Sequence, residues 1–153
     1  MTNSRPYLTL LMTLSALLVL FGGSGCGSGE GTAAASLPKS KFIMRADLIC
    51  SDAGNEQAKM AAEYLFDHPG AKEADLVVPA AIPPLEKELR ELEELGGPSG
   101  QEEEFETYLQ EYAKALDALK AEPQAALSPA NNPFTKANEL ASELKAGDCS
   151  QTP

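Results

Sequence analysis

The sequence predicts an all-α protein, a small antiparallel bundle of about four helices that follows a signal peptide and a flexible tether. Three observations predict this fold class. Apolar residues recur at three- and four-residue steps in four separate segments of the chain. Proline and glycine lie between these segments, where turns join antiparallel helices. No segment shows the convincing alternation of apolar and polar residues that a half-buried strand requires.

Residues 1–25 have the pattern of a bacterial export signal. The basic residue Arg5 precedes an apolar run over residues 8–21, and small residues follow that run. The apolar run is shorter than the ~20 residues that a membrane-spanning helix needs. A charged start, a short apolar run and small residues together indicate a cleavable signal peptide.

The end of this signal resembles the lipobox of bacterial lipoproteins. Ser24 and Gly25 directly precede Cys26. The resemblance implies that Cys26 receives a diacylglycerol and becomes the first residue of the mature chain. We then expect a lipid-anchored protein on the extracytoplasmic side of the cell membrane. The alternative is ordinary cleavage after Ala35, at the end of a run of small residues, which would give a secreted protein.

The chain after the signal divides into three parts by composition. Residues 26–38 consist mostly of Gly, Ser and Ala with almost no large apolar side chain, which predicts a flexible tether. Residues 39–149 carry the helical pattern and are enough for one domain with one core. Residues 150–153 are expected to form a short tail.

The chain has three cysteines, an odd number for an exported protein. Lipidation of Cys26 leaves Cys50 and Cys149, an even pair in an oxidising compartment, where a disulfide is the default expectation. This bridge would close a loop of about 100 residues, which the chain-entropy model values at roughly 4.7 kcal/mol. We therefore expect a structural disulfide rather than a catalytic thiol.

The first predicted helix begins at Lys39 and ends before Pro69 and Gly70, which favour a turn. The second is predicted to begin near Pro83 or Pro84, because a proline in the first helical turn loses no hydrogen bond. Its leucines form a coiled-coil-like stripe that is too short for a sustained dimer seam, so we expect it in the core. The apolar faces are Phe42, Ala46, Ile49, Cys50, Ala53, Met60, Ala61, Tyr64 and Leu65 in the first helix, and Ile82, Leu85, Leu89, Leu92 and Leu95 in the second.

Gly96 and Gly97 are predicted to end the second helix, and Ser99 with Glu102 to form a capping box that opens the third. We expect a fourth helix to open at Asn132-Pro133 and to close at Gly147. The inward faces are Phe105, Tyr108, Leu109, Tyr112, Leu116 and Leu119 in the third helix, and Phe134, Ala137, Leu140, Ala141 and Leu144 in the fourth. The core is predicted to centre on Ile49, Leu89, Leu92, Leu109, Leu116 and Leu140.

Four segments of the helical part carry motifs that support these expectations together. They are F-I-M-R-A-D-L-I-C at residues 42–50, Val78-Pro79, L-G-G-P-S-G-Q-E at residues 95–102, and the stretch from Pro133 to Cys149. They resemble an uncharacterised family of exported or lipid-anchored bacterial helical proteins, which pair an A-D-x-I-C motif with a cysteine near the C-terminus. The resemblance covers most of residues 41–149. It implies a helical fold and strengthens the expected disulfide, but it implies no activity.

Composition and motifs exclude several functions. The net charge of −11 repels phosphate backbones, so we expect no nucleic-acid partner, and we expect contact with the membrane only through the lipid on Cys26. His68 is the only histidine, and beside Pro69 it is expected to be a solvated turn residue. A zinc site is not expected, because two oxidised cysteines cannot bind the metal and the chain has no second histidine. Adjacent glutamates such as Glu93-Glu94 point in different directions on a helix, so we do not expect them to act as a catalytic pair in glycoside chemistry. We expect no enzyme activity, no metal site and no cofactor.

Two classes of function remain. The first is a noncatalytic lipid-anchored envelope protein that acts as a protein-interaction or accessory module, with an unknown envelope protein as its partner. The alternative is a lipoprotein that binds a small ligand or a cation. An interior filled by Leu, Phe and Tyr would favour the first class, and a cavity with convergent polar groups would favour the second.

Overall fold

Four helices account for most of the computed structural model, which describes residues 36–128 and 130–152. They are α1 (Lys39–Asp67), α3 (Ile82–Leu95), α4 (Glu102–Ala121) and α5 (Thr135–Leu144). Shorter elements connect and follow them: α2 (Glu73–Leu76), the π-helix η1 (Val77–Ala81) and the 3-10 helices η2 (Pro123–Leu127) and η3 (Asp148–Gln151). The all-α prediction is confirmed for this part of the chain. The signal, Cys26 and both candidate cleavage sites lie outside the described residues.

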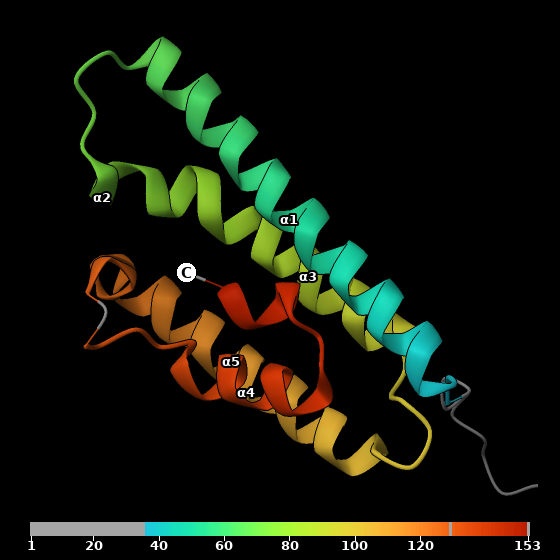
Figure 1. Cartoon of the computed structure of the whole chain (residues 1–153). Helices are drawn as coiled ribbons and strands as arrows, with labels where there is room; N and C mark the ends of the chain where they lie inside the picture. Colours follow the sequence, from blue (N-terminus) through green and yellow to red (C-terminus); the bar gives the residue numbers. More distant parts are fainter. Residues whose placement is uncertain (1–35, 129, 153) are drawn as a thin grey trace, which may run out of the picture. The chain divides into compact units, whose positions relative to one another are not determined.

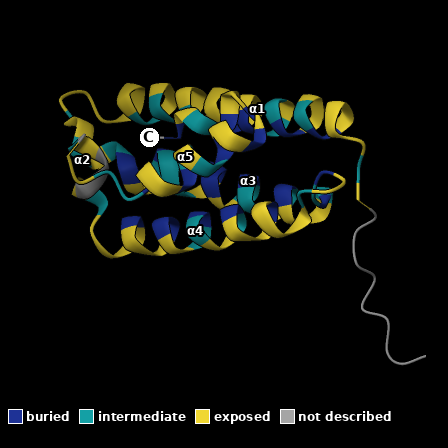
Figure 2. Cartoon of the chain, turned by 60° about the horizontal axis from the view of Figure 1, so that its bottom comes forward, coloured by how far each residue is buried: buried dark blue, intermediate teal, exposed yellow. Residues whose placement is uncertain are grey.

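The bundle is built from neighbouring antiparallel helices (Figure 1). Helix α1 runs alongside α3, α3 packs against α4, and α4 packs against α5. The last element, η3, contacts both α5 and α1, so the end of the chain returns to the first helix. Figure 2 shows that each long helix turns one buried face inward and leaves the opposite face exposed. Helix periodicity therefore predicted the architecture correctly.

Helix α3 begins with a proline in its first turn, as predicted, but the chain becomes helical earlier than predicted. The chain is already helical from Glu73 and passes through the π-helix η1 before α3 begins at Ile82. In a regular α-helix the rings of Pro83 and Pro84 would clash with carbonyls four residues earlier. The π-helix widens this turn, and the N–H of Ile82 donates to the carbonyl of Val77, five residues before it.

The N-terminal edge of the fold includes residues that composition assigned to the tether. The N–H of Leu37 donates to Gly97 O at 3.0 Å, and the N–H of Ser99 donates to Leu37 O at 2.7 Å. These two bonds make an isolated bridge between Leu37 and Pro98. Backbone pairing needs no apolar side chain, so composition could not predict it. Residues 36–38 therefore belong to the folded part.

Two predicted helix ends are wrong, while Gly96 ends α3 as expected, with a φ of 75° that favours glycine. The capping box of Ser99 and Glu102 does not form. Helix α4 begins at Glu102 after Gln101, and the Glu102 carboxylate accepts from the N–H of Gly100 at 2.9 Å. At the end of α5, Lys145 and not Gly147 takes the left-handed position, with a φ of 69°.

Asn132 does act near the start of α5, but the helix begins two residues later than predicted. Its Oδ1 accepts from the N–H of Phe134 at 2.7 Å, and the helix itself begins at Thr135.

The C-terminal residues that were expected to form a short tail pack against the bundle instead. Thr152 is buried, and its carbonyl accepts from the Asn138 side chain at 2.9 Å.

A row of aromatic rings runs through the core. Phe42 of α1 meets Phe105 edge to face, with 5.0 Å between ring centroids. The row continues along α4 through Tyr108 to Tyr112, which meets Phe134 at 5.2 Å. All these rings are buried. Edge-to-face pairs at such distances stabilise a core beyond their area burial, and Tyr108 and Tyr112 are core residues, as the sequence predicted.

The predicted centre of the core is only partly right. Leu92 and Leu116 are buried, but Ile49, Leu89, Leu109 and Leu140 are half-buried and pack at its margin. The aromatic row and the small residues Ala46, Ala137 and Ala141 occupy the middle instead. Small residues let the helices approach closely, which pushes the leucines at the edges of each apolar face toward the surface. The stripe of α1 also loses burial after Ala53, and Leu65 is exposed.

Replacement of Leu92 or Leu116 by Ala is expected to lower the free energy of unfolding by about 2–5 kcal/mol, because each side chain is fully enclosed. Leu109→Ala and Leu140→Ala are expected to cost about 1 kcal/mol, since these half-buried sites lose less packing. Urea unfolding with the disulfide intact measures all four. An equal loss for Leu140→Ala and Leu92→Ala would contradict this assignment of the core.

Candidate functional site at the disulfide and Glu88

The disulfide between Cys50 and Cys149 forms the first part of the site. It joins the middle of α1 to η3, with 5.1 Å between the two Cα atoms. This separation lies in the usual range for a disulfide of about 4.4–6.8 Å. Cys149 Sγ also lies 3.4 Å from the carbonyl oxygen of Ala46 on α1. The predicted bridge is confirmed, and with it the packing of the first helix against the end of the chain.

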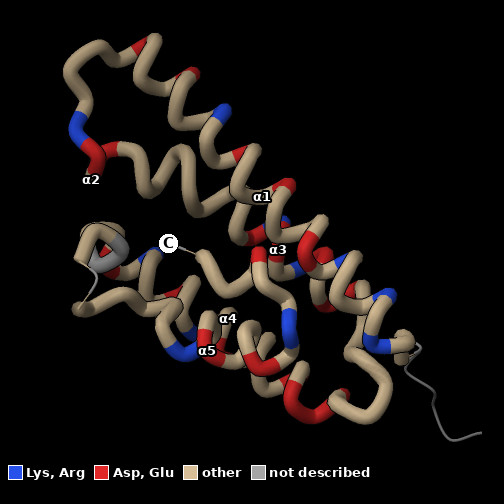
Figure 3. The backbone as a smooth tube through the Cα atoms, viewed as in Figure 1, with Lys and Arg blue, Asp and Glu red and all other residues tan. Residues whose placement is uncertain are grey.

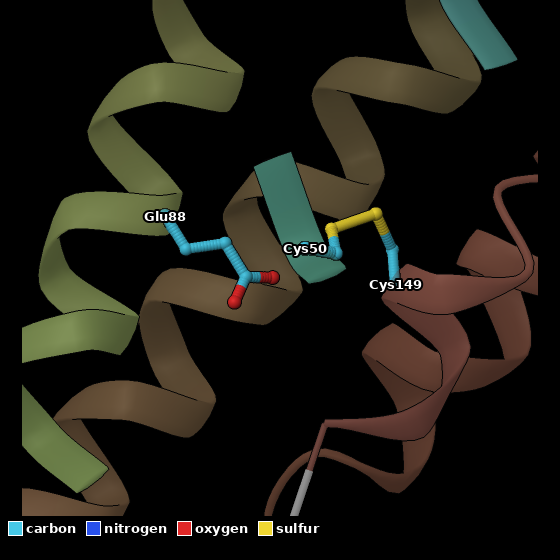
Figure 4. Close-up of side chains that lie close together, drawn as sticks. All are labelled: Cys50, Glu88 and Cys149. Atoms are coloured by element: carbon cyan, nitrogen blue, oxygen red, sulfur yellow. A yellow bond between two sulfur atoms is a disulfide. The ribbon is translucent and has the colours of Figure 1, made fainter. Parts of the chain in front are cut away.

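Glu88 of α3 lies next to this bridge and is the feature that sequence analysis missed. Its side chain points toward the two sulfur atoms (Figure 4), and the residue is only 3% exposed. Position 88 follows Leu85 by three residues and precedes Leu92 by four, so all three share the buried face of α3. The apolar stripe predicted Leu89 at this place. Glu88 and Leu89 both fit a spacing of three and four residues between Leu85 and Leu92, so the spacing alone does not select between them.

Burial changes the acidity of this carboxyl group. Loss of hydration raises the pKa of Glu88 to about 8, and the nearby charge of Glu91 adds to the rise. The Tyr112 hydroxyl opposes it, because a donor near the carboxylate favours the charged form. Glu88 is therefore mostly protonated and neutral at pH 7.

Two buried tyrosines of α4 complete the polar group. Burial first, and then the charge of Glu88, raise the pKa of Tyr108 and of Tyr112. Within the described residues, Glu88 Oε1 and both hydroxyls lack a hydrogen bond of regular geometry. Buried polar groups without partners are uncommon and costly, at about 1–3 kcal/mol each. Glu88 Oε1 is therefore a buried acceptor that no described residue satisfies.

A cavity of about 300 Å³ opens beside Glu88 and the disulfide. Helices α1, α3 and η3 all contribute to its wall. The lining residues are Cys50, Ser51, Gly54, Gln57, Leu85, Glu88, Asp148, Gln151 and Thr152. Ser51, Gly54, Asp148 and Gln151 are exposed at the surface, whereas Leu85 and Glu88 are buried. The cavity thus leads from an exposed polar rim to a buried acid.

The disulfide limits which ligands the residues around Glu88 can bind. One donor atom each from Cys50, Cys149 and Glu88 lies within 4.8 Å of the others. Two thiolates and a carboxylate would suit Zn²⁺, but sulfur atoms bonded to each other are not thiolates. In the oxidised protein the site offers one buried acid, hydroxyl and amide groups and a partly apolar wall. These groups can bind a ligand.

The other residues considered from sequence lie away from this cavity. His68 is exposed at the end of α1, where its ring stacks on Tyr64 and its Nδ1 lies 3.0 Å from Tyr64 O. This position agrees with the predicted solvated turn. Glu93 and Glu94 are exposed on α3. Figure 3 shows acidic residues spread along the helices with fewer basic residues between them, in line with the net charge of −11.

The sequence matches no family model, and no curated protein or solved structure matches it. The resemblance to exported bacterial helical proteins therefore stays a prediction. No helix among the described residues is long and apolar enough to cross a membrane.

Loss of the disulfide between Cys50 and Cys149 is expected to lower the stability of the whole domain. Reduction, or the double substitution Cys50→Ser with Cys149→Ser, should lower the free energy of unfolding by about 2–5 kcal/mol, because the unfolded chain regains the freedom of a large loop. Urea unfolding with and without a reductant measures this change. A loss below about 0.5 kcal/mol would contradict a structural role.

Glu88 is expected to make stability depend on pH in a defined window. The unfolded chain loses this proton near pH 4.5 and the folded chain near pH 8, so the unfolded state binds fewer protons between these values. Stability should therefore fall with a slope of about 1.4 kcal/mol per pH unit from this group in that window, and level off above it. The measurement is the difference in unfolding free energy between the wild type and Glu88→Gln at pH 5, 7 and 9. A difference that does not change with pH would show that Glu88 is not held neutral.

Proposed function

We propose that this protein is a noncatalytic, lipid-anchored envelope protein that binds a protein partner through the end of its bundle away from the tether. Cys26 carries the lipid, and the bundle works on the extracytoplasmic side of the membrane. The export signal and the residues around Cys26 support the location. The observation that supports binding is a group of exposed apolar side chains.

These side chains come from the C-terminal end of α1, from η1 and from η2, and η1 contacts both α1 and η2. We call them the distal surface: Leu65, Phe66, Val78 and Leu127, with exposed fractions of 41%, 87%, 54% and 39%. A second cavity of about 210 Å³, lined mainly by apolar residues, lies beside Leu127 between α1, η1 and α4. Large exposed apolar side chains next to a cavity are typical of protein-interaction sites.

The position of the distal surface suits a tethered protein. The chain enters the fold at residues 36–38, beside the start of α1, and the distal surface lies at the other end of this helix. A helix of 29 residues is about 43 Å long. A partner could thus bind at the far end of the bundle while the lipid on Cys26 holds the near end.

Proximity crosslinking of the full protein in its native envelope tests this proposal. We expect Phe66→Asp to reduce capture of the main neighbour at least fivefold, because a buried charge is costly in an apolar contact. Leu48→Asp is the matched control, since Leu48 is also exposed on α1 but lies outside the distal surface. Equal capture by both variants would overturn the distal surface as the binding site.

Membrane attachment is tested in the same preparation. Mass spectrometry of the membrane-extracted N-terminus is expected to find a diacylglycerol on Cys26, and Cys26→Ala should release the protein from the membrane. A mature chain that begins at Ser36 in the medium would replace the anchored protein with the secreted alternative.

The second candidate function, binding of a small ligand or cation, is favoured by a different observation. The cavity at Glu88 is lined by the convergent polar groups that distinguish this class, and they include a buried acid whose Oε1 has no hydrogen-bond partner among the described residues.

A further inference from the structure

We propose that the cavity at Glu88 binds a small aliphatic amine, with an ammonium group at the Glu88 carboxylate and the carbon chain directed toward Asp148 at the rim. This inference rests on the second candidate function, ligand binding, and does not depend on the distal surface. The occupant follows from the charge, the size and the wall chemistry of the cavity.

The charge of the lining favours a cation. Among the described residues that line it, Glu88 and Asp148 are ionisable and none is Lys or Arg. Glu88 Oε1 is buried without a hydrogen-bond partner, whereas an ammonium group offers three donors. An anion would meet two acidic side chains and no basic one among the described lining residues, on a chain whose net charge is already −11.

Size and wall chemistry favour an organic cation over a metal ion. A volume of about 300 Å³ is far larger than a bare ion needs. Leu85, the disulfide and Gly54 supply an apolar part of the wall, and a Cβ atom built on Gly54 would have no neighbour within 4 Å. In the oxidised protein only one buried carboxyl faces the cavity, whereas Ca²⁺ takes six to eight oxygen ligands.

The rim gives the second end of the ligand a partner. Asp148 opens η3, and its N–H donates to the Asp47 carboxylate of α1 at 3.1 Å, which holds this end of η3 against the first helix. Asp148, which is exposed, and Glu88, which is buried, both line this cavity. A short diamine can pair with both acids while its methylene groups contact Leu85 and the disulfide.

Binding is expected to release a proton at neutral pH. The groups that face Glu88 are Glu91 of its own helix, Tyr108 and Tyr112 of α4, and Asp148 of η3, while Cys50 on α1 is in the disulfide and does not titrate. Neither tyrosine titrates below pH 10, so Glu88 is the group that ionises. Its pKa of about 8 leaves roughly a tenth of the molecules ionised at pH 7. Affinity should therefore rise about tenfold from pH 7 to pH 9, where an alkyl ammonium of pKa ~10.4 stays charged.

Titration calorimetry of the full protein in neutral detergent tests the proposal, with 1,4-diaminobutane as the probe at physiological salt. Buffers of different ionisation enthalpy report the released proton. We expect Glu88→Gln to weaken binding at least tenfold and to abolish the pH dependence. Asp148→Asn should weaken 1,4-diaminobutane several-fold but leave butylamine unchanged. Glu93→Gln removes an exposed charge from the same helix and is the matched control, expected to have no effect.

Two analogues with four-carbon chains, the neutral 1,4-butanediol and the anionic succinate, distinguish failure of the amine proposal from failure of ligand binding as such. Thermal unfolding and a test for free thiols first confirm that each variant is folded with its bridge intact. Equal affinity of the wild type and Glu88→Gln for 1,4-diaminobutane would overturn the proposal. Binding of an analogue or of Ca²⁺ but not of the diamine would overturn the amine as ligand and keep ligand binding. No binding of any probe would overturn both.

Discussion

The bridge between Cys50 and Cys149 decides where the last part of the chain lies. The element η3 has only four residues, too few to bury much apolar surface by itself. The disulfide connects it to the middle of α1 across a sequence separation of 99 residues. Gln151 and Thr152 line the cavity at Glu88 together with Leu85 of α3, so that the bridge and the end of the chain form part of its wall. The wall beside Glu88 therefore includes a covalent link between α1 and η3.

Packing in the core offsets the free-energy cost of burying the polar groups around Glu88. A neutral carboxyl and two tyrosine hydroxyls without regular hydrogen bonds oppose folding by the work of removing them from water. The aromatic row from Phe42 to Phe134 runs past the same groups and contributes edge-to-face packing between three parts of the chain. A core of this kind can hold an acid that is neutral at pH 7. A leucine at position 88 would fill the space with no such cost, which makes Glu88 informative about function.

The two candidate surfaces occupy different parts of the bundle and differ in chemistry. The distal surface is apolar and exposed, and it suits a protein partner. The cavity at Glu88 lies halfway along α1 and is acidic, and it suits a small cation. Helix α1 contributes to both, through Leu65 and Phe66 at its end and Cys50 in its middle.

The sequence by itself determined the helical class, the four long helices and the pairing of Cys50 with Cys149, because periodicity and cysteine count are local or arithmetic signals. It also placed Tyr108, Tyr112, Leu92 and Leu116 in the core. Only the tertiary structure decided which edge of each apolar face is innermost, since this depends on which neighbouring helices pack against that face. For the same reason Glu88 turned inward where Leu89 was expected. A helical face is about 100° wide, and only the neighbouring helices select the side chain at its centre.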